Sequence, residues 1–212
     1  MSGHGRETGK KTAAGTGNAK GRASKQEILE AASSLFGEVG FHEASLRDIA
    51  GRVGMTHPGL LHHFPTKKVL LAGVLAYRDE QDLAVMERFV SADGMDFDQC
   101  MVEVAKWNAS RPGVVALFAT LSAEATSADH PAHGFFVARY TTLLAQLEEF
   151  YQGLKQAGRM RNDVVPATAA KTVMALMDGL QIQWLLALAT GDQALDVDMS
   201  HVITEYIGSL RI

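Results

Sequence analysis

The chain has 212 residues, of which 47% are hydrophobic and 21% charged, with a formal net charge of −4. This composition is typical of a soluble globular protein with one or two domains and a sizeable core. The sequence has neither an uninterrupted apolar run of about 18 residues nor the apolar segment of a secretory signal, so we expect no transmembrane helix and no secretion. The single cysteine, Cys100, excludes an internal disulfide and a cysteine-based zinc site. We therefore expect a cytoplasmic protein with no membrane partner and no cofactor.

The charge is unevenly distributed along the chain. Residues 1–70 hold ten Lys and Arg against six Asp and Glu, whereas residues 71–212 hold ten against eighteen. An attraction for phosphate would therefore belong to the first third of the chain. Alternatively, the first 25 residues alone skew the balance, with six cations and one acid, since charge runs are often only solvated surface.

Residues 1–23 lack apolar periodicity and are rich in Gly, Ala, Thr and Lys, which predicts a disordered basic arm. Such an arm could lie along phosphates or enter a minor groove, or it could be an inert tail. Ser24 is the predicted N-cap of a first helix over residues 24–39, which Gly40 ends. The apolar positions of this helix recur at helical spacing, and they are Ile28, Leu29, Ala31, Ala32, Leu35, Phe36 and Val39.

Two short helices joined by a glycine turn are predicted for residues 45–64. Ser45 is the expected N-cap of the first, with Asp48 completing a capping box. Gly54 fits the position after this helix that needs a positive φ. The apolar stripe of the first helix consists of Leu46, Ile49, Ala50 and Val53.

The second of the two helices is expected to begin after Thr56 as its N-cap, with Pro58 in its first turn and Pro65 beyond its end. Its inner face would consist of Leu60, Leu61 and Phe64. Two helices with so short a turn have the layout of a helix-turn-helix. A long helix is then predicted from about Lys67 to Val90, with its apolar positions at Val69, Leu70, Val74, Leu75 and Leu83.

The rest of the chain is predicted to be helical throughout, with no alternating strand pattern. The expected helices, the first of them capped by Asp96 or Asp98, span about 96–108, 114–125, 131–157, 167–190 and 197–210. The helix at 167–190 is apolar nearly all round and must bury two faces, whereas the last helix has a single apolar face. The predicted fold class is all-α.

The segment from Ser45 to Lys67 closely resembles the DNA-binding region of the tetracycline-repressor (TetR) family of bacterial transcription regulators. The matching positions cover about forty-five residues with their surroundings, and they include Arg47, Asp48, Ile49, Ala50, Gly54, Thr56, Leu60, His63, Phe64 and Lys67. Leu61 stands where the family usually has a tyrosine, whose hydroxyl often bonds a phosphate. Lys68 replaces a commoner acidic residue and adds a cation that could offset this loss.

The resemblance implies a domain organisation and a function. Residues 24–82 would form a three-helix helix-turn-helix domain, and residues 83–212 a helical ligand-binding and dimerisation domain. The protein would be a homodimeric, ligand-responsive repressor that binds a palindromic DNA operator and is released by a small molecule. The helices at 167–190 and 197–210 would pair with their twofold mates, although a monomeric bundle with an unusually deep core would show the same pattern.

The resemblance also implies a set of DNA contacts. The groove-facing residues would be Thr56, His57, Pro58, Gly59 and His62, and the residues that hold backbone phosphates would be Ser45, Arg47 and Lys67. His57 is the best candidate for reading a base edge. Ser45 and Thr56 would be needed as caps whether or not DNA binds, and His63 is expected to pack internally.

A ligand cavity follows from the resemblance rather than from the pattern of residues. The aromatic and flexible apolar residues that could enclose it are Trp107, Phe118, Phe135, Phe136, Tyr140, Met174, Met177 and Trp184. Its polar anchors would be Gln181, Asn108 and Asp178. Each aromatic or methionine at such spacing could equally be plain core. The expected effector is apolar or aromatic.

Two other classes of function were weighed against this interpretation. His130 and His133 are spaced so that both could ligate one metal in a helical enzyme, but Pro131 lies between them and no acidic residue follows as in H-E-x-x-H. The motifs of serine hydrolases and nucleotide-binding enzymes are missing, so no enzymatic activity is expected. A helical small-molecule-binding protein without DNA function is the other alternative.

Overall fold

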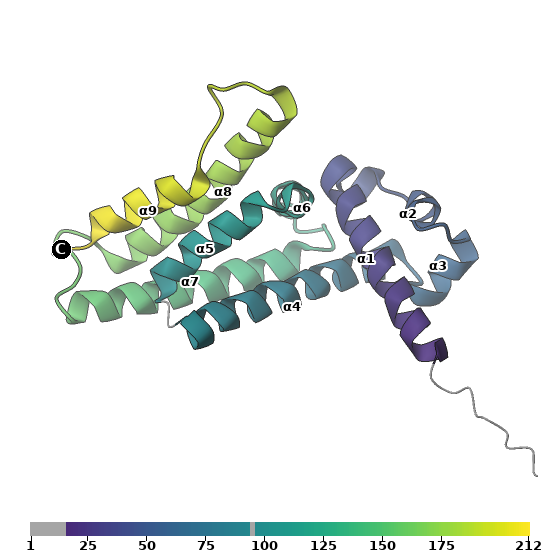
Figure 1. The fold of residues 1–212 in the computed structure, drawn as a ribbon, viewed down its shortest axis with the longest axis horizontal. Helices are drawn as coiled ribbons and strands as arrows, with labels where there is room; N and C mark the ends of the chain where they lie inside the picture. Colours follow the sequence, from purple (N-terminus) through teal and green to yellow (C-terminus); the bar gives the residue numbers. More distant parts are fainter. Residues whose placement is uncertain (1–15, 94–95) are drawn as a thin grey trace, which may run out of the picture.

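The computed structural model describes residues 16–93 and 96–212, which fold into helices (Figure 1). In chain order these are α1 (Thr16–Glu43), α2 (Leu46–Arg52), α3 (His57–His63), α4 (Lys67–Asp93), α5 (Phe97–Ala109), α6 (Pro112–Glu124), α7 (His133–Gln156), α8 (Pro166–Thr190) and α9 (Met199–Leu210). Within the described ranges the β pairing amounts to one isolated bridge, between Met160 and Arg211. The predicted all-α fold class is confirmed.

The helices form two groups along an elongated molecule. Figure 1 shows α1, α2 and α3 gathered at one end and α5 to α9 bundled toward the other, with α4 running from the first group along the second. The long α4 therefore belongs to both groups.

The first helix begins earlier than predicted. Because α1 starts at Thr16, the predicted disordered arm over residues 1–23 is wrong for its last part, and Ser24 lies inside the helix instead of capping it. Residues 1–15 of the predicted arm lie outside the described residues. The predicted end is confirmed, since Gly40 breaks the helix with a φ of 79°, a conformation that favours glycine.

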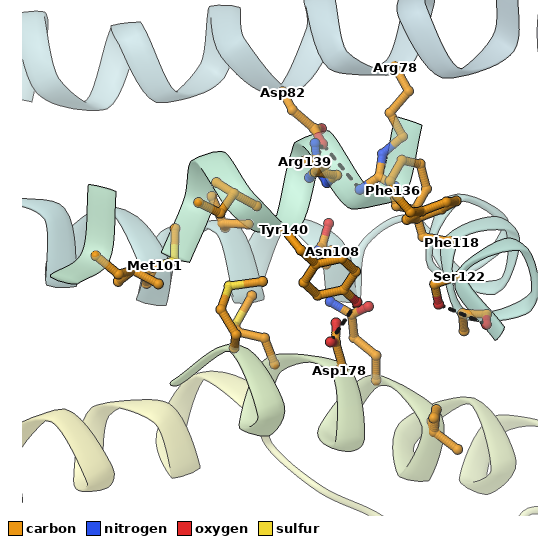
Figure 2. A pocket seen from close by; sticks show the side chains of 18 of the residues that line it. Arg78, Asp82, Met101, Asn108, Phe118, Ser122, Phe136, Arg139, Tyr140 and Asp178 are labelled. Carbon is orange, nitrogen blue, oxygen red and sulfur yellow. Dashed lines mark hydrogen bonds and ion pairs between the residues drawn. The ribbon is translucent and has the colours of Figure 1, made fainter. Parts of the chain in front are cut away.

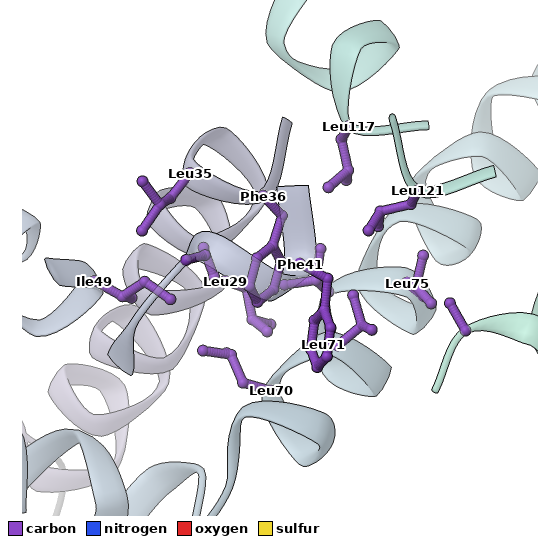
Figure 3. Close-up of a cluster of buried hydrophobic side chains, with 14 of the residues drawn as sticks. Leu29, Leu35, Phe36, Phe41, Ile49, Leu70, Leu71, Leu75, Leu117 and Leu121 are labelled. Carbon is purple, nitrogen blue, oxygen red and sulfur yellow. The ribbon is translucent and has the colours of Figure 1, made fainter. Parts of the chain in front are cut away.

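One hydrophobic core joins α1–α4 to α6 and α7. Leu117 and Leu121 of α6 are fully buried and pack into the cluster formed by the N-terminal helices (Figure 3). The close approach depends on Gly37 of α1, because a Cβ there would lie 2.8 Å from the Leu117 amide nitrogen. The core therefore continues across the domain boundary predicted at residue 82. The members of the cluster from the first four helices include Ile28, Phe36, Ile49, Leu60, Phe64, Leu71 and Val74.

Two of the predicted apolar positions are exposed. Val39 and Val69 expose 46% and 48% of their surface. Val39 directly precedes the break in α1 at Gly40, and Val69 lies in the first turn of α4. At such helix ends the apolar stripe can continue beyond the helices that pack against it.

A second core holds α5, α7, α8 and α9 together and is anchored by a buried polar group. Asp98 of α5 is 3% exposed and accepts hydrogen bonds from the Tyr151 hydroxyl (2.8 Å) and from Arg211 Nη2 (2.6 Å). Asp96 caps α5 through a capping box with Gln99. Of the two aspartates predicted as caps, Asp96 therefore fills that role, and Asp98 ties the C-terminal residues to the bundle.

The helix α8 has the predicted bounds, and Gly191 ends it with a φ of 70°. Within one chain it buries one face, while Ile182, Leu186 and Leu188 on its surface are about half exposed. Among the described residues it is the one helix long and apolar enough to cross a membrane, a criterion that the core helices of soluble proteins also meet. Its apolar outer face is unpaired in the single chain.

Candidate DNA-binding surface and effector cavity

The pair α2–α3 is built by local hydrogen bonds at the predicted positions. The Ser45 hydroxyl oxygen accepts from the Asp48 amide (3.1 Å), so Ser45 is the N-cap of α2 as predicted. The Asp48 carboxylate accepts from the Ser45 hydroxyl (2.6 Å), which differs from the capping box expected from the sequence. Gly54 has the predicted positive φ, 65°, and turns the chain toward α3.

The start of α3 is fixed by Thr56 and Gly59. The Gly59 amide donates to the Thr56 hydroxyl (3.2 Å), and Pro58 occupies the first turn, as predicted. A Cβ on residue 59 would lie 3.2 Å from the same hydroxyl oxygen. The missing side chain of Gly59 therefore keeps the cap intact, a local role in addition to the predicted close approach to DNA.

The outer side of the α2–α3 pair is accessible. Arg47, Thr56, Pro58 and His62 are exposed, while the predicted inner residues Leu60 and Phe64 are buried. Three further predicted contacts, Ser45, His57 and Gly59, are partly exposed, as are Leu61 and His63. The structure thus brings all the predicted groove-facing residues to one short helix that is free on its outer side.

Lys67 has a structural partner that the sequence did not reveal. Its ammonium nitrogen donates to the carbonyl oxygens of His42 (3.0 Å) and Ala44 (2.9 Å) and lies 4.6 Å from the centre of the Phe41 ring. These bonds satisfy carbonyls at the end of α1. Contact with a phosphate remains a prediction for Lys67, and that contact would have to share an ammonium already engaged by the fold.

A second contact missed by the sequence ties α2 to α1. Arg52 Nη1 donates to Glu38 Oε1 (2.8 Å), and the hydrogen bonds from Arg52 and Ser34 lower the pKa of Glu38 to about 2. Ser34 and Glu38 precede Arg52 by eighteen and fourteen residues. Helical periodicity within one helix cannot predict contacts over such separations. Arg52 is therefore held on the protein surface by α1.

A cavity of about 120 Å³ lies between α4, α5, α6, α7 and α8. Eight of the eleven predicted lining and anchoring residues meet there from different helices. Figure 2 labels five of them, Asn108, Phe118, Phe136, Tyr140 and Asp178. The predicted residues that line it are Asn108, Phe118, Phe136, Tyr140, Met174, Met177, Asp178 and Gln181. The structure adds apolar residues that were not predicted, among them Phe97, Met101, Leu143, Leu147 and Ile182.

Three predicted lining residues lie elsewhere. The Trp107 ring packs on the guanidinium of Arg111, 3.1 Å from the ring centre to the guanidinium carbon, instead of lining the cavity. Phe135 packs edge-on against Phe118 and Phe136, outside the lining, and Trp184 joins the second core. Each belongs to a helix that contributes to the region, but its side chain is used for packing between helices.

The cavity has polar groups at two places. The Tyr140 hydroxyl donates to Asp178 Oδ2 (2.7 Å), and burial together with Asp178 raises the pKa of Tyr140, while burial raises that of Asp178. On the α4 side lie Arg78, Asp82 and Arg139, which were not predicted as lining residues. Charged residues on a long helix read as solvated surface in a sequence, so no local signal marked them.

The two histidines considered as metal ligands are engaged separately. His130 lies with its Nε2 3.3 Å from Glu124 Oε2, and His133 Nδ1 is 2.8 Å from the Ala125 carbonyl oxygen. Glu124 also accepts from the Phe41 amide (3.0 Å) and so joins α6 to the break in α1. A cluster of three or more metal-ligating side chains does not form in the part of the chain that the structure describes.

Known proteins are similar to this chain both in the α2–α3 region and over most of its length. Residues 28–74, which contain α2 and α3, match the family model of bacterial regulatory proteins of the tetR family. The HTH-type transcriptional regulator UidR of Escherichia coli (strain K12) is 24% identical over 88% of this chain and 92% of its own length. The HTH-type transcriptional repressor Rv1474c of Mycobacterium tuberculosis is 26% identical over 80% of this chain and 84% of its own length. Residues 28–74 thus carry the DNA-binding region of the tetR family.

The chain shares its fold with solved structures over most of its length. A transcriptional regulator from Saccharomonospora viridis in complex with choline is 21% identical, with a TM-score of 0.74 over 90% of this chain and 99% of that one. The match of residues 28–74 to the tetR-family model and the similarity to curated HTH-type regulators identify the chain as a DNA-binding transcriptional regulator, with its helix-turn-helix at α2–α3.

The structure locates Leu61, which stands where the TetR family usually has a tyrosine. Leu61 is half-buried on α3, and Lys68 is exposed in the first turn of α4. A leucine there can pack but cannot donate a hydrogen bond, so any phosphate contact near this site must come from another side chain. Lys68 is the accessible cation nearest in sequence.

Proposed function

We propose that this regulator is a homodimeric repressor, which binds a palindromic operator through α2–α3 and is released when a small molecule occupies the cavity. The observation that carries the proposal is the geometry of α4. Its first turn holds the end of α1 through Lys67, and its middle lines the cavity through Arg78. An occupant that favours one position of α4 would change operator affinity by its differential binding to the two states.

The proposed homodimer is supported by the outer face of α8. Ile182, Leu186 and Leu188 are about half exposed, and exposed apolar patches on a soluble protein mark interaction sites. Pairing of this face, with α9, across a twofold axis would bury the second apolar side of α8 and set two copies of α3 on one duplex. Leu186→Glu should convert the dimer to a monomer in analytical ultracentrifugation, while Lys171→Glu, an exposed change at the other end of α8, should not.

The proposed domain boundary lies near residue 82 within α4. The residues before it would bind DNA, and the residues after it would bind the effector and form the dimer. The shared core and the Glu124 contact to Phe41 support coupling between the two parts. The repressor assignment draws on the relative in Mycobacterium tuberculosis, which is described as a repressor. That a small molecule binds between the helices is supported by the choline complex of the structural neighbour, whose ligand itself is not carried over to this chain. Repression and small-molecule binding both come to this chain as proposals.

The decisive experiment is selection of genomic DNA fragments by the purified full-length protein at stated salt, followed by affinity measurement on the selected site. Arg47→Ala should weaken binding to all sequences and reduce the slope of log affinity against log salt by about 1, because it removes a phosphate contact. His57→Ala should change the preferred sequence, because it removes a base contact. The matched control is Arg88→Ala, an exposed arginine on α4. Unchanged binding by both variants would refute the assignment of α3.

A further inference from the structure

Three arginines share two carboxylates on the α4 side of the cavity. Arg78 Nη2 lies 3.2 Å from Asp82 Oδ2, and Arg111 Nη2 lies 3.4 Å from Asp82 Oδ1. Arg139 is 2.7 Å from Asp79 and 3.8 Å from Asp82. Figure 2 shows the Arg78, Asp82 and Arg139 side chains converging at this end of the cavity, with the Phe118 and Phe136 rings beside them.

The charges of this group do not balance. Three guanidinium groups face two carboxylates, so the group carries one positive charge in excess. Arg111 and Asp79 do not line the cavity, whereas a further carboxylate, Asp178, does, bonded to the Tyr140 hydroxyl. Among the charged groups of the lining, Arg78 and Arg139 therefore face Asp82 and Asp178, and the charges balance. What remains costly is a buried donor without a partner, and a bound acceptor would remove that cost.

Arg78 is the cavity-lining member of the group that has unpartnered donors, since Arg111, whose Nε is also unpartnered, does not line the cavity. The Arg78 side chain is 9% exposed, yet Nε and Nη1 have no hydrogen-bond partner among the described residues. The Phe118 ring covers one face of the guanidinium, 3.5 Å from the ring centre. Burial and the neighbouring Arg139 and Arg111 lower the pKa of Arg78 to about 10, against the pull of Asp82. Buried arginine donors normally find acceptors, so these two are poised for a ligand.

The remainder of the cavity is apolar and small. Its walls beyond the arginines are formed mainly by Met101, Phe118, Phe136, Leu147, Met174 and Met177. The volume of about 120 Å³ is near that of an engineered apolar cavity of about 150 Å³ that binds benzene. The cavity therefore suits one aromatic ring or a short aliphatic chain next to one polar group.

We propose that the effector is a small organic acid, with an apolar body against the methionines and phenylalanines and a single carboxylate that accepts from one of the unpartnered donors, Nε or Nη1, of Arg78. This proposal rests on the proposed function of the cavity as the effector site. A neutral analogue would offer the buried Arg78 donors a weaker acceptor, and an amine would offer them none. Asp178 on the other side would disfavour a second acidic group and accept a hydrogen-bond donor.

The test compares three probes with the same body, 3-phenylpropionate, 3-phenylpropanamide and 3-phenylpropylamine, by calorimetry on the full-length protein. The acid should bind about tenfold to a hundredfold more tightly than the amide, as expected for hydrogen bonds to a charged partner, and the amine more weakly than either. Arg78→Met should abolish the preference for the acid. The matched control Arg88→Met makes the same change at an exposed arginine of the same helix and should preserve that preference.

Each other result would overturn the assignment. Equal or tighter binding of the amide, binding of none of the three probes, or a preference for the acid that survives Arg78→Met would each do so. The comparison of the three probes on the unaltered protein decides the matter even if Arg78→Met fails to fold. Operator affinity is measured separately, without and with the acid. Acid that binds at the cavity without changing operator affinity refutes the proposed function alone, whereas release by the amide as readily as by the acid refutes only the carboxylate.

Discussion

The α2–α3 pair and the effector cavity differ in how far apart along the chain their parts lie. The caps and turn of α2–α3 are made by residues three to five positions apart, such as Ser45 with Asp48 and Thr56 with Gly59. The cavity draws on α4, α5, α6, α7 and α8, from Arg78 to Ile182. Local rules of capping therefore specify the DNA-binding element, whereas long-range packing specifies the element that senses the effector.

The largest expected effect is a loss of stability at Gly37, where α1 packs closely against α6, compared with a matched change at Gly51 in α2. Gly37→Val would place side-chain atoms against the backbone of Leu117 and Gly113, which lie 2.8 and 3.0 Å from a Cβ at this position. The backbone cannot move aside as a side chain can, so the free energy of unfolding should fall by about 3 kcal/mol. The melting temperature should fall by about 6–12 °C in circular dichroism.

Gly51→Ala is the matched change in the local element. A Cβ on residue 51 meets no atom within 4 Å, and α2 should gain up to about 1 kcal/mol because alanine favours helix. If both variants lost stability equally, the contrast between local and long-range assembly would not hold.

A change of intermediate size tests whether α3 is as local as its caps indicate. Thr56→Ala removes the hydroxyl that accepts from the Gly59 amide and should cost about 1 kcal/mol of unfolding free energy, measured in urea. Thr56→Ser keeps the hydroxyl and should retain most of that stability. Because the cavity residues are untouched, calorimetric binding of 3-phenylpropionate should be the same in both variants. Lost effector binding in Thr56→Ala would show that the two elements are not independent.

The smallest expected effect concerns pH at the contact between the two regions. Burial lowers the pKa of His130, which the Glu124 carboxylate only partly offsets. Below pH of about 6.5 the unfolded chain takes up a proton at this histidine more readily than the folded protein does, so stability falls with falling pH. Above that pH both states are neutral and the contribution is constant.

The measurement compares urea unfolding at several pH values between 7.5 and 5.5. His130→Gln should reduce the loss of stability over this window relative to the unaltered protein. His201→Gln, an exposed histidine in α9, should behave as the unaltered protein does. A steeper pH dependence in His130→Gln would contradict the assignment.

The contrast also explains which features could be predicted from the sequence. The caps at Ser45 and Thr56, the turn at Gly54 and the bounds of α8 follow from residues close together in the chain, and they are confirmed. Periodicity marks which face of a helix is apolar but does not say which partner covers it. For this reason Trp107 was expected in the cavity, although its ring packs on Arg111.

The burial of charged residues could not be predicted from the sequence either. Arg78 and Arg139 lie on different helices, and each looks like surface when its own helix is considered alone. Their burial against Asp82 and the Phe118 ring arises only when α4, α6 and α7 pack together. Lys67 likewise matched a phosphate-binding position, while its two hydrogen bonds to the end of α1 depended on the fold.

The continuous helix α4 has a mechanical consequence. Arg78 follows Lys67 by eleven residues on the same helix, which corresponds to a rise of about 16 Å. If α4 moves as a rigid lever, a tilt of about 5° at the cavity displaces its first turn by about 1.4 Å over that length. A displacement of that size is enough to break a base-edge hydrogen bond, whose donor–acceptor distance varies by only about 0.5 Å. In the proposed homodimer, a molecule no larger than a substituted benzene would thus set whether the two copies of α3 fit the spacing of one duplex.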